Sequence, residues 1–197
     1  MTYKYQDHYF QQAKKENYLA RAVYKLKEIQ DKYKILRPGD RVLDLGAAPG
    51  SWLQYTSRIV GAKGLVVGVD LKKVDYSFPA NVVTLERNIL DSDLGPELVE
   101  KFPPFDVVLS DMAPATSGIR VADSARSASL FEEALKIAEI SLKSQGHFLA
   151  KIFQGSEFHP LLLEVKRRFG WVKVVKPDAS KKMSKEIYVL AMRFKKP

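Results

Sequence analysis

The sequence contains no cysteine, which excludes disulfides and any metal or redox site built on thiolates. Its three histidines, His8, His147 and His159, share no metal-ligand spacing, and we therefore expect no metal site. No apolar run approaches the roughly 20 residues that a membrane-spanning helix requires. Residues 1–17 are too polar for a signal peptide. These absences predict a protein of the cytoplasm that has no membrane partner.

Positive charge, by contrast, is in excess. Lysine and arginine total 32 against 23 aspartates and glutamates, which gives a formal net charge of +9. Such an excess favours a polyanionic partner, and nucleic acid is the leading candidate. An anionic membrane surface, or a general contribution to solubility, is the alternative on charge alone. The hydrophobic fraction of 46 % is ordinary for a globular protein.

Hydrophobic periodicity predicts a single α/β domain over residues 1–197. Apolar residues at helical spacing between 18 and 29 predict that residues 1–35 are a helical segment. From residue 36 onward, short apolar runs alternate with amphipathic stretches. The expected strands are 41–45, 65–70, 81–85, 105–111, 147–152, 171–175 and 187–194. The expected helices are 51–60, 92–101, 124–143 and 158–169, and Gln145 and Gly146 are expected to end the third of them.

This alternation is typical of a doubly wound, mostly parallel sheet with helices on both faces. The strands are continuously apolar, as strands are when both of their faces are covered. Residues 176–185, with no helix, separate the last two strands. That length permits the seventh strand to pair antiparallel at the edge of the sheet.

The loop after the first expected strand is a candidate ligand site. In such sheets ligands bind beyond the carboxyl ends of the strands. The segment DLGAAPGSW at 44–52 is rich in small residues, which allow a ligand to approach the backbone closely. Ala48 and Pro49 interrupt the dinucleotide fingerprint GxGxxG, and proline offers no amide to a pyrophosphate. The loop therefore suits a cofactor without a pyrophosphate and counts against a nicotinamide dehydrogenase.

Two carboxylates accompany this loop. Asp44 lies in the first expected strand, and Asp70 ends the second. A carboxylate about 20 residues after such a loop can accept hydrogen bonds from ribose hydroxyls, although a helix cap is the alternative role of Asp70. The combination predicts a cofactor that contains a nucleoside. Its expected binding residues here are Asp44, Gly46, Gly50 and Asp70.

Four segments resemble one known family. They are DLGAAPGSW at 44–52, SDMAPATSG at 110–118, KIFQG at 151–155 and SKEIY at 184–188. In this order they closely resemble the FtsJ (RrmJ/RlmE) family of ribosomal RNA 2′-O-methyltransferases, from about residue 9 to the C-terminus. The resemblance implies a Rossmann-like fold with a seven-stranded sheet, S-adenosyl-L-methionine as cofactor, and methyl transfer to a ribose 2′-hydroxyl of RNA.

The resemblance also assigns the catalytic residues. The Lys-Asp-Lys-Glu tetrad of the family, called the tetrad below, corresponds to Lys25, Asp111, Lys151 and Glu186. We expect Lys151 to orient or deprotonate the hydroxyl, and the residues leave open which of these it does.

The cofactor positions of the family correspond to Gly50, Trp52 and Asp70, with Asp111 near the methionine end. The chain departs from the family after the third strand. There an acidic residue near the adenine is replaced by Asn88, with Asp91 three residues later. An Asn carbonyl can still accept a hydrogen bond from the adenine amino group.

By resemblance, the favoured substrate is a uridine of large-subunit (23S-type) ribosomal RNA, either free or in the assembled subunit. Transfer RNA is the alternative target, because close relatives share the tetrad. A non-catalytic RNA-binding assembly factor is the rival from another class. We expect no DNA and no obligate protein partner.

Two basic segments are candidates for RNA contact. Residues 1–27 mix aromatic side chains, which can stack on unpaired bases, with lysines and arginines, which can meet phosphates. We expect about half of these aromatics to pack against the sheet instead. The second segment, 176–185, leads directly into Glu186, and its alternative role is a solvated charge run. Arg120 and Arg126 are expected to flank the substrate cleft.

Overall fold

The computed structural model describes residues 2–181 and 183–196, with side chains from residue 8 onward. In chain order the elements are α1 (Thr2–Lys15), α2 (Val23–Tyr33), β1 (Arg41–Leu45), α3 (Ser51–Val60), β2 (Leu65–Asp70), β3 (Val82–Glu86), α4 (Leu94–Lys101), β4 (Phe105–Ser110), α5 (Arg120–Ser141), β5 (Leu142–Phe153), α6 (Phe158–Arg168), β6 (Phe169–Val175) and β7 (Glu186–Phe194). The alternation of strands and helices after β1 confirms the predicted α/β class.

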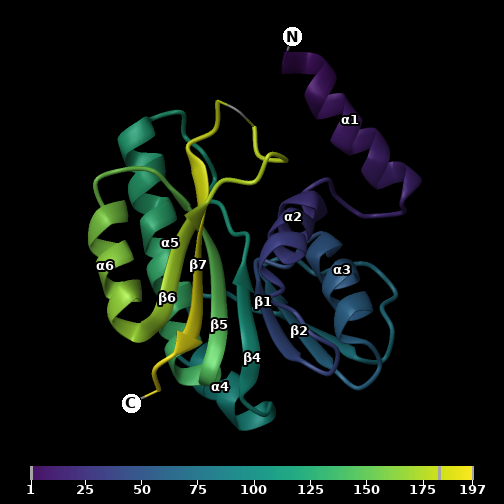
Figure 1. Cartoon of the computed structure of the whole chain (residues 1–197), viewed down its shortest axis with the longest axis vertical. Coiled ribbons are helices and arrows are strands. Elements are labelled where there is room, and N and C mark those ends of the chain that lie inside the picture. The colour runs from purple at the N-terminus through teal and green to yellow at the C-terminus, as the bar shows by residue number, and fades with distance from the viewer. Residues whose placement is uncertain (1, 182, 197) are drawn as a thin grey trace.

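The strands form one seven-stranded sheet in the order β3-β2-β1-β4-β5-β7-β6. The pairs from β3 across to β5 are parallel, and β7 is antiparallel to both β5 and β6. Helices α4, α5 and α6 lie on one face, and α2 and α3 lie on the other (Figure 1). The predicted doubly wound, mostly parallel sheet is therefore confirmed.

The position of β7 differs from the prediction, which put the last strand at the edge. β7 instead lies between β5 and β6, and β6 is the edge strand. Ile187 and Val189 of β7 belong to one core cluster, whereas Tyr188 and Leu190 belong to the cluster on the opposite face. β7 is buried on both faces for most of its length, whereas β6 is largely part-exposed, as expected of an interior strand and an edge strand. The edge prediction was wrong because it used only the length of the connection.

The junction of α5 and β5 also differs. β5 begins at Leu142 rather than at residue 147, and its ladder with β4 shifts register between Phe105 and Val107. Gln145, in the shifted part, has a positive φ of 66°. The Gln-Gly pair at 145–146 therefore forms an irregularity within a strand instead of ending the preceding helix.

Helix α2 is packed as part of the core. It begins at Val23, and Val23, Leu26 and Ile29 share a hydrophobic cluster with Leu149 and Leu190 of the sheet. Helix α1, in contrast, extends away from the sheet at the N-terminal end (Figure 1). The segment expected to face RNA is thus divided into a packed helix and a projecting one.

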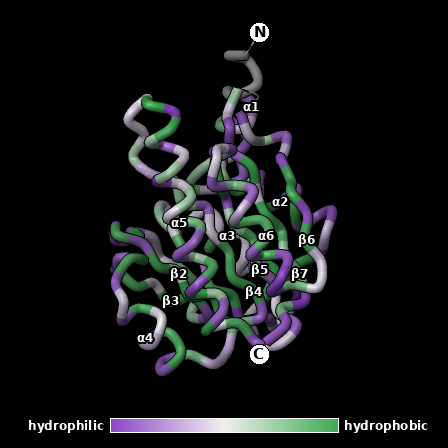
Figure 2. The backbone as a smooth tube through the Cα atoms, turned by 90° about the vertical axis from the view of Figure 1, so that its left-hand side faces the viewer, coloured by the Kyte–Doolittle hydropathy of each residue, from purple (hydrophilic) through white to green (hydrophobic). Residues whose placement is uncertain are grey.

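Hydropathy follows this layering. Along the tube in Figure 2 the strands are mainly hydrophobic, and hydrophilic residues gather in the outer helices and loops. Among residues 2–181 and 183–196, no helix combines the length and the apolar character needed to cross a membrane.

Candidate active site

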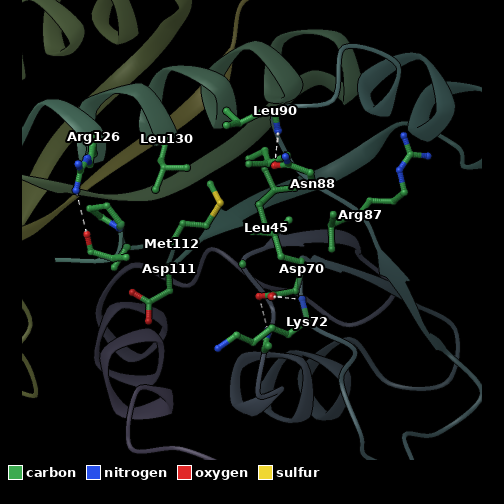
Figure 3. A pocket seen from close by; sticks show the side chains of 18 of the residues that line it. Leu45, Asp70, Lys72, Arg87, Asn88, Leu90, Asp111, Met112, Arg126 and Leu130 are labelled. Atoms are coloured by element: carbon green, nitrogen blue, oxygen red, sulfur yellow. Dashed lines mark hydrogen bonds between the residues drawn. The ribbon is translucent and has the colours of Figure 1, made fainter. Parts of the chain in front are cut away.

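A pocket of about 620 Å³ opens at the carboxyl ends of β1 to β4 (Figure 3). Parallel strands end at the same edge of the sheet, so the loops that follow them meet there. Its polar and charged lining residues are Asp70, Lys72, Arg87, Asn88, Asp111, Arg126 and Ser129. Three of these polar and charged residues, Asp70, Asn88 and Asp111, were predicted from the sequence to contact the cofactor.

Two glycines shape the loop between β1 and α3. Gly46 lines the pocket with a φ of +81°, and Gly50 has a φ of +112°, both in the region that disfavours side chains. A Cβ on Gly50 would lie 2.8 Å from Cζ of Phe78. A Cβ on Gly46 would collide with Met112, which follows β4. Glycine at these positions lets the loops after β1, β2 and β4 approach one another around the pocket.

Asp70 is held at the end of β2 by backbone donors. Its Oδ2 accepts a hydrogen bond from the N–H of Ala48 at 2.9 Å, and its Oδ1 accepts one from the N–H of Lys72 at 2.8 Å. Each carboxylate oxygen has a further lone pair available. Asp70 is therefore oriented by the protein and can still accept hydrogen bonds from a ligand in the pocket.

On the far side of the pocket, Asn88 lines the wall and Asp91 does not. Oδ1 of Asn88 accepts a hydrogen bond from the N–H of Leu90 at 3.1 Å (Figure 3). Asp91 lies 3.5 Å from the Arg87 guanidinium. Of the two residues that the sequence proposes for the adenine, the geometry favours Asn88.

Asp44 lies in the core behind these loops. It is 1 % exposed, and neither carboxylate oxygen has a hydrogen-bond partner among the described residues. Burial raises the pKa of this carboxyl well above its ordinary value, and the charges of Asp111 and Asp70 raise it further. An unpartnered buried carboxyl of this kind favours a cationic or hydrogen-donating ligand nearby.

Asp44, Gly50 and Trp52 are absent from the described residues that line the pocket, and a direct contact of Asp44 with a cofactor stays a prediction. The indole N–H of Trp52 donates to the carbonyl of Ala22 at 2.9 Å, just before α2. Its ring stacks on Tyr188 with 6.2 Å between centroids. Trp52 thus supports the start of α2, and a direct contact of Gly50 or Trp52 with a cofactor stays a prediction.

The structure brings the four tetrad residues together next to this pocket, although they come from α2, β5, β7 and the residue after β4. Lys151 Nζ lies 2.9 Å from Asp111 Oδ1 and donates to the Asp111 carbonyl at 2.6 Å. Lys25 Nζ lies 2.5 Å from Glu186 Oε1 and 3.8 Å from Asp111 Oδ1. Two cations and two anions therefore form one alternating ion-pair cluster.

The cluster is largely shielded from solvent. The side chains of Lys25, Asp111, Lys151 and Glu186 are 12 %, 15 %, 5 % and 13 % exposed. Charges removed from water hold one another more strongly and in a narrower range of geometries. Such an arrangement can position a substrate hydroxyl and stabilise charge that develops on it.

Comparison with known proteins agrees with this geometry. The family model of FtsJ-like methyltransferases matches residues 18–194, a range that includes the whole tetrad. The chain belongs to the FtsJ-like methyltransferase family. This result confirms the resemblance and the methyltransferase activity inferred from the sequence.

Named relatives of this FtsJ-like methyltransferase cover its full length. It is 66 % identical over 196 residues to the ribosomal RNA large subunit methyltransferase E of Syntrophobacter fumaroxidans, with 100 % of both chains covered. Identity to the protein of the same name from Bdellovibrio bacteriovorus is 48 %, with 98 % of both chains covered. A Plasmodium falciparum structure described as a ribosomal RNA methyltransferase superposes with a TM-score of 0.80 at 28 % identity, covering 91 % of this chain and 100 % of that chain.

Tyr188 is a site residue of this methyltransferase to which the sequence analysis gave no role. Its hydroxyl donates to Asp111 Oδ1 at 2.5 Å, and Lys25 Nζ lies 5.8 Å from its ring centroid. Tyr188 follows Glu186 by two positions on β7, and side chains two apart on a strand point to the same face. That spacing within the SKEIY segment was the signal that could have identified it.

Among the aromatic residues of the N-terminal segment with described side chains, Tyr9, Tyr18 and Tyr24 are packed and Phe10 is exposed. Tyr24 is buried and lies 5.2 Å and 6.3 Å, between ring centroids, from the partly buried Tyr9 and Tyr18. Phe10 is 52 % exposed, and Lys14 Nζ lies 5.9 Å from its ring centroid. The side chains of Tyr3, Lys4 and Tyr5 lie outside the described residues.

The predicted cleft arginines behave differently from each other. Arg126 lines the pocket and donates to the carbonyl of Ala115 at 3.4 Å, whereas the exposed Arg120 begins α5. The basic loop before β7 contacts the tetrad directly. Its Ser180 hydroxyl donates a hydrogen bond to Glu186 at 3.1 Å. A basic surface therefore adjoins the ion-pair cluster on its loop side.

Proposed function

We propose that this methyltransferase transfers the methyl group of S-adenosyl-L-methionine to a ribose 2′-hydroxyl of large-subunit ribosomal RNA. The observation that carries the proposal is the double role of Asp111, which lines the pocket and also pairs with Lys151. A hydroxyl held by the tetrad would therefore lie beside a group bound in the pocket. The name of the Syntrophobacter fumaroxidans relative, a ribosomal RNA large subunit methyltransferase, supports this choice of RNA.

The pocket residues fit S-adenosyl-L-methionine. A volume of about 620 Å³ lies in the ordinary range for cofactor sites. Asp70 would accept hydrogen bonds from the ribose hydroxyls, and Asn88 would meet the adenine. The unpartnered carboxyl of Asp44, together with Asp111, suits the positively charged methionine end. When bound, this cofactor supplies a methyl group that its positive sulfur has already activated.

The tetrad is suited to positioning the acceptor hydroxyl. Lys151 directs hydrogen bonds to the carbonyl oxygen and to Oδ1 of Asp111. An ammonium group has three donors, so one N–H is left for the hydroxyl oxygen. Because Lys151 already donates to a carboxylate, orientation accounts for its geometry better than proton abstraction. Positioning of this kind can supply roughly 7–11 kcal/mol of a reaction barrier.

Lys25 and Glu186 complete the site from the other side. Lys25 pairs with both acids and keeps Asp111 and Glu186 close together, and with Lys151 included the formal charges of the cluster balance. The acceptor hydroxyl would then lose its proton to water as its oxygen bonds to the methyl carbon and the bond from that carbon to sulfur breaks. Each tetrad residue thus holds another in place, and the two carboxylates can offset the positive charge that builds on the attacking oxygen until its proton leaves.

The surroundings of the tetrad suit an RNA strand. Lys176, Lys181 and Lys185 of the loop before β7 are exposed and can meet phosphates. The exposed Phe10 beside Lys14 can stack on an unpaired base. The favoured target remains a uridine, and the proposed place of action is the cytoplasm. DNA and an obligate protein partner are not part of the proposal.

The test incubates the protein and methyl-labelled cofactor in separate reactions with large ribosomal subunits, with their protein-free RNA and with transfer RNA, all from a strain that lacks the modification. We expect label in the large-subunit RNA and a single 2′-O-methyl stop, at a uridine, in primer extension. Label confined to transfer RNA would move the target to that class. Binding of subunits without incorporation would favour an assembly factor, and tight NAD binding without S-adenosyl-L-methionine binding would favour a dehydrogenase.

A further inference from the structure

The loop between β6 and β7 is fastened to α2 by one carboxylate. Glu28 of α2 accepts hydrogen bonds from the backbone N–H of Asp178 at 2.6 Å and of Ala179 at 2.9 Å. It also accepts one from the hydroxyl of Tyr9 at 3.2 Å. Arg21, just before α2, donates to the carbonyl of Ala179 at 2.6 Å. We call these contacts the latch.

The latch is one residue away from the tetrad. Ser180, which follows Ala179, donates its hydroxyl to Glu186 Oε1 at 3.1 Å. That same oxygen lies 2.5 Å from Lys25 Nζ. Lys25 and Glu28 are three positions apart on α2, so their side chains are neighbours on one face of the helix. The contacts therefore form a closed ring that begins and ends on α2.

A carboxylate is well matched to this position. Its two oxygens receive two consecutive backbone N–H groups, and such charge-assisted bonds are stronger than bonds between neutral groups. Beside the latch, α2 and the loop are separated by a pocket of about 550 Å³ lined by Glu28, Lys32, Pro177 and Asp178. Ala179 packs into the core cluster, and on the side of this pocket the polar contacts of Glu28 fasten the loop to α2.

We propose that Glu28 is a positioning residue of the active site, which holds the β6–β7 loop so that Ser180 keeps Glu186 against Lys25. The inference rests on the proposed function, because its kinetic consequence is measured in methyl transfer. Glu28 does not line the cofactor pocket. Its loss should therefore reduce turnover and leave cofactor binding as it is.

The kinetic test compares Glu28→Gln, Ser180→Ala and the double variant. An amide at position 28 cannot accept from both N–H groups with its two terminal atoms. We expect each single variant to lower kcat about tenfold, with KM for S-adenosyl-L-methionine within about twofold of wild type. The double variant should fall no further than the lower single one, because both changes act through Glu186.

Asp31→Asn is the matched control. Asp31 is an exposed acid on the same helix and lines the same 550 Å³ pocket, and we expect this variant to keep wild-type kcat. A wild-type kcat in Glu28→Gln would overturn the proposal. Equal losses of kcat and cofactor affinity would also overturn it, since they would indicate a general effect on the fold. Should Glu28→Gln fail to fold, Ser180→Ala tests the same link.

Hydrogen exchange tests the latch without any RNA. The amides of Asp178 and Ala179 should exchange faster in Glu28→Gln than in wild type or Asp31→Asn, while exchange in α3 stays the same. Unchanged exchange at these two amides would refute the latch. Faster exchange in the variant, combined with a wild-type protein that methylates no RNA, would refute the proposed function and leave the latch in place.

Discussion

Tyr188 donates its phenolic hydrogen to Asp111 with 2.5 Å between the two oxygens, although 77 positions separate the residues in sequence. Burial raises the pKa of Tyr188 well above its ordinary value, and the charges of Asp111 and Glu186 raise it further. The phenol is therefore a neutral donor at physiological pH. Oδ1 of Asp111 consequently accepts from Tyr188 and from Lys151 at the same time.

Tyr188→Phe should lower kcat about tenfold without loss of the fold. The change removes one of two donors to Asp111 Oδ1, so the carboxylate that holds Lys151 is less well oriented. Steady-state kinetics and calorimetric binding of S-adenosyl-L-methionine would measure the two effects separately. Tyr55→Phe is the control, because Tyr55 of α3 is also buried, which raises its pKa to about 12, and the side-chain hydrogen bonds of the tetrad among the described residues do not include it. An unchanged kcat in Tyr188→Phe would exclude this role.

Lys151→Ala and Asp111→Ala should each reduce methyl transfer by roughly 10²–10⁴-fold, the usual contribution of a group that acts on the reacting proton or orients its carrier. Each change removes one charge from the shielded cluster and leaves the opposite charge less well compensated, so the melting temperature should fall as well. Lys151→Arg should not restore the rate, because the guanidinium differs in shape and reach. Lys136→Ala, on the exposed face of α5, is the control. Folded variants with wild-type rates would refute the assignments.

Asp44→Asn should stabilise the cofactor-free protein and weaken cofactor binding. The folded state raises the pKa of Asp44 above its model-compound value of 3.8, so folded protein binds the proton more tightly than unfolded protein. Its contribution to stability therefore falls as pH rises from about 4 towards the raised pKa. At pH 7 the neutral amide of the variant removes the unfavourable contribution of the buried carboxyl to folding. Thermal melts would detect the resulting rise in melting temperature. A lower melting temperature, or an unchanged affinity for S-adenosyl-L-methionine, would contradict the prediction.

Gly50→Ala should destabilise the protein more than Gly61→Ala. Both glycines have a positive φ, +112° and +67°, so both variants incur the backbone strain, about 1 kcal/mol. Only the Cβ at position 50 meets a neighbour, Cζ of Phe78 at 2.8 Å, whereas the space around position 61 is open. Chemical denaturation would give both free energies of unfolding. Equal losses of unfolding free energy in the two variants would show that the close approach of Phe78 to Gly50 does not contribute to the difference in stability.

Asn88→Ala should raise KM for S-adenosyl-L-methionine about tenfold with little change in kcat, the pattern expected when a group binds ground state and transition state equally. Asp91→Asn should stay near wild type, since Asp91 pairs with Arg87 and does not line the pocket. Initial rates at varied cofactor concentration would measure both constants. The reverse result would assign the adenine contact to Asp91.

Much of the fold could be predicted from local pattern. The bounds expected for the first two strands and the helix between them agree with β1, β2 and α3. The two strands are short apolar runs, and the helix between them is an amphipathic stretch that ends at Gly61, so the local pattern alone defines them. The place of β7 could not be predicted in this way, because the order of strands depends on which faces other segments cover. The irregular start of β5 was missed because Gln145 and Gly146 carry the same signal at a helix end and at a strand irregularity.

By itself, the sequence determined the α/β class, the family and the identities of the tetrad residues, because these depend on residue types and their order along the chain. Only the tertiary structure decided that Lys25 pairs with Glu186, that Lys151 pairs with Asp111, and that Tyr188 donates to Asp111. The physical reason is that ion pairs and hydrogen bonds act over a few ångströms in space. Which residues come that close depends on insertion of β7 beside β5 and on packing of α2 across the sheet.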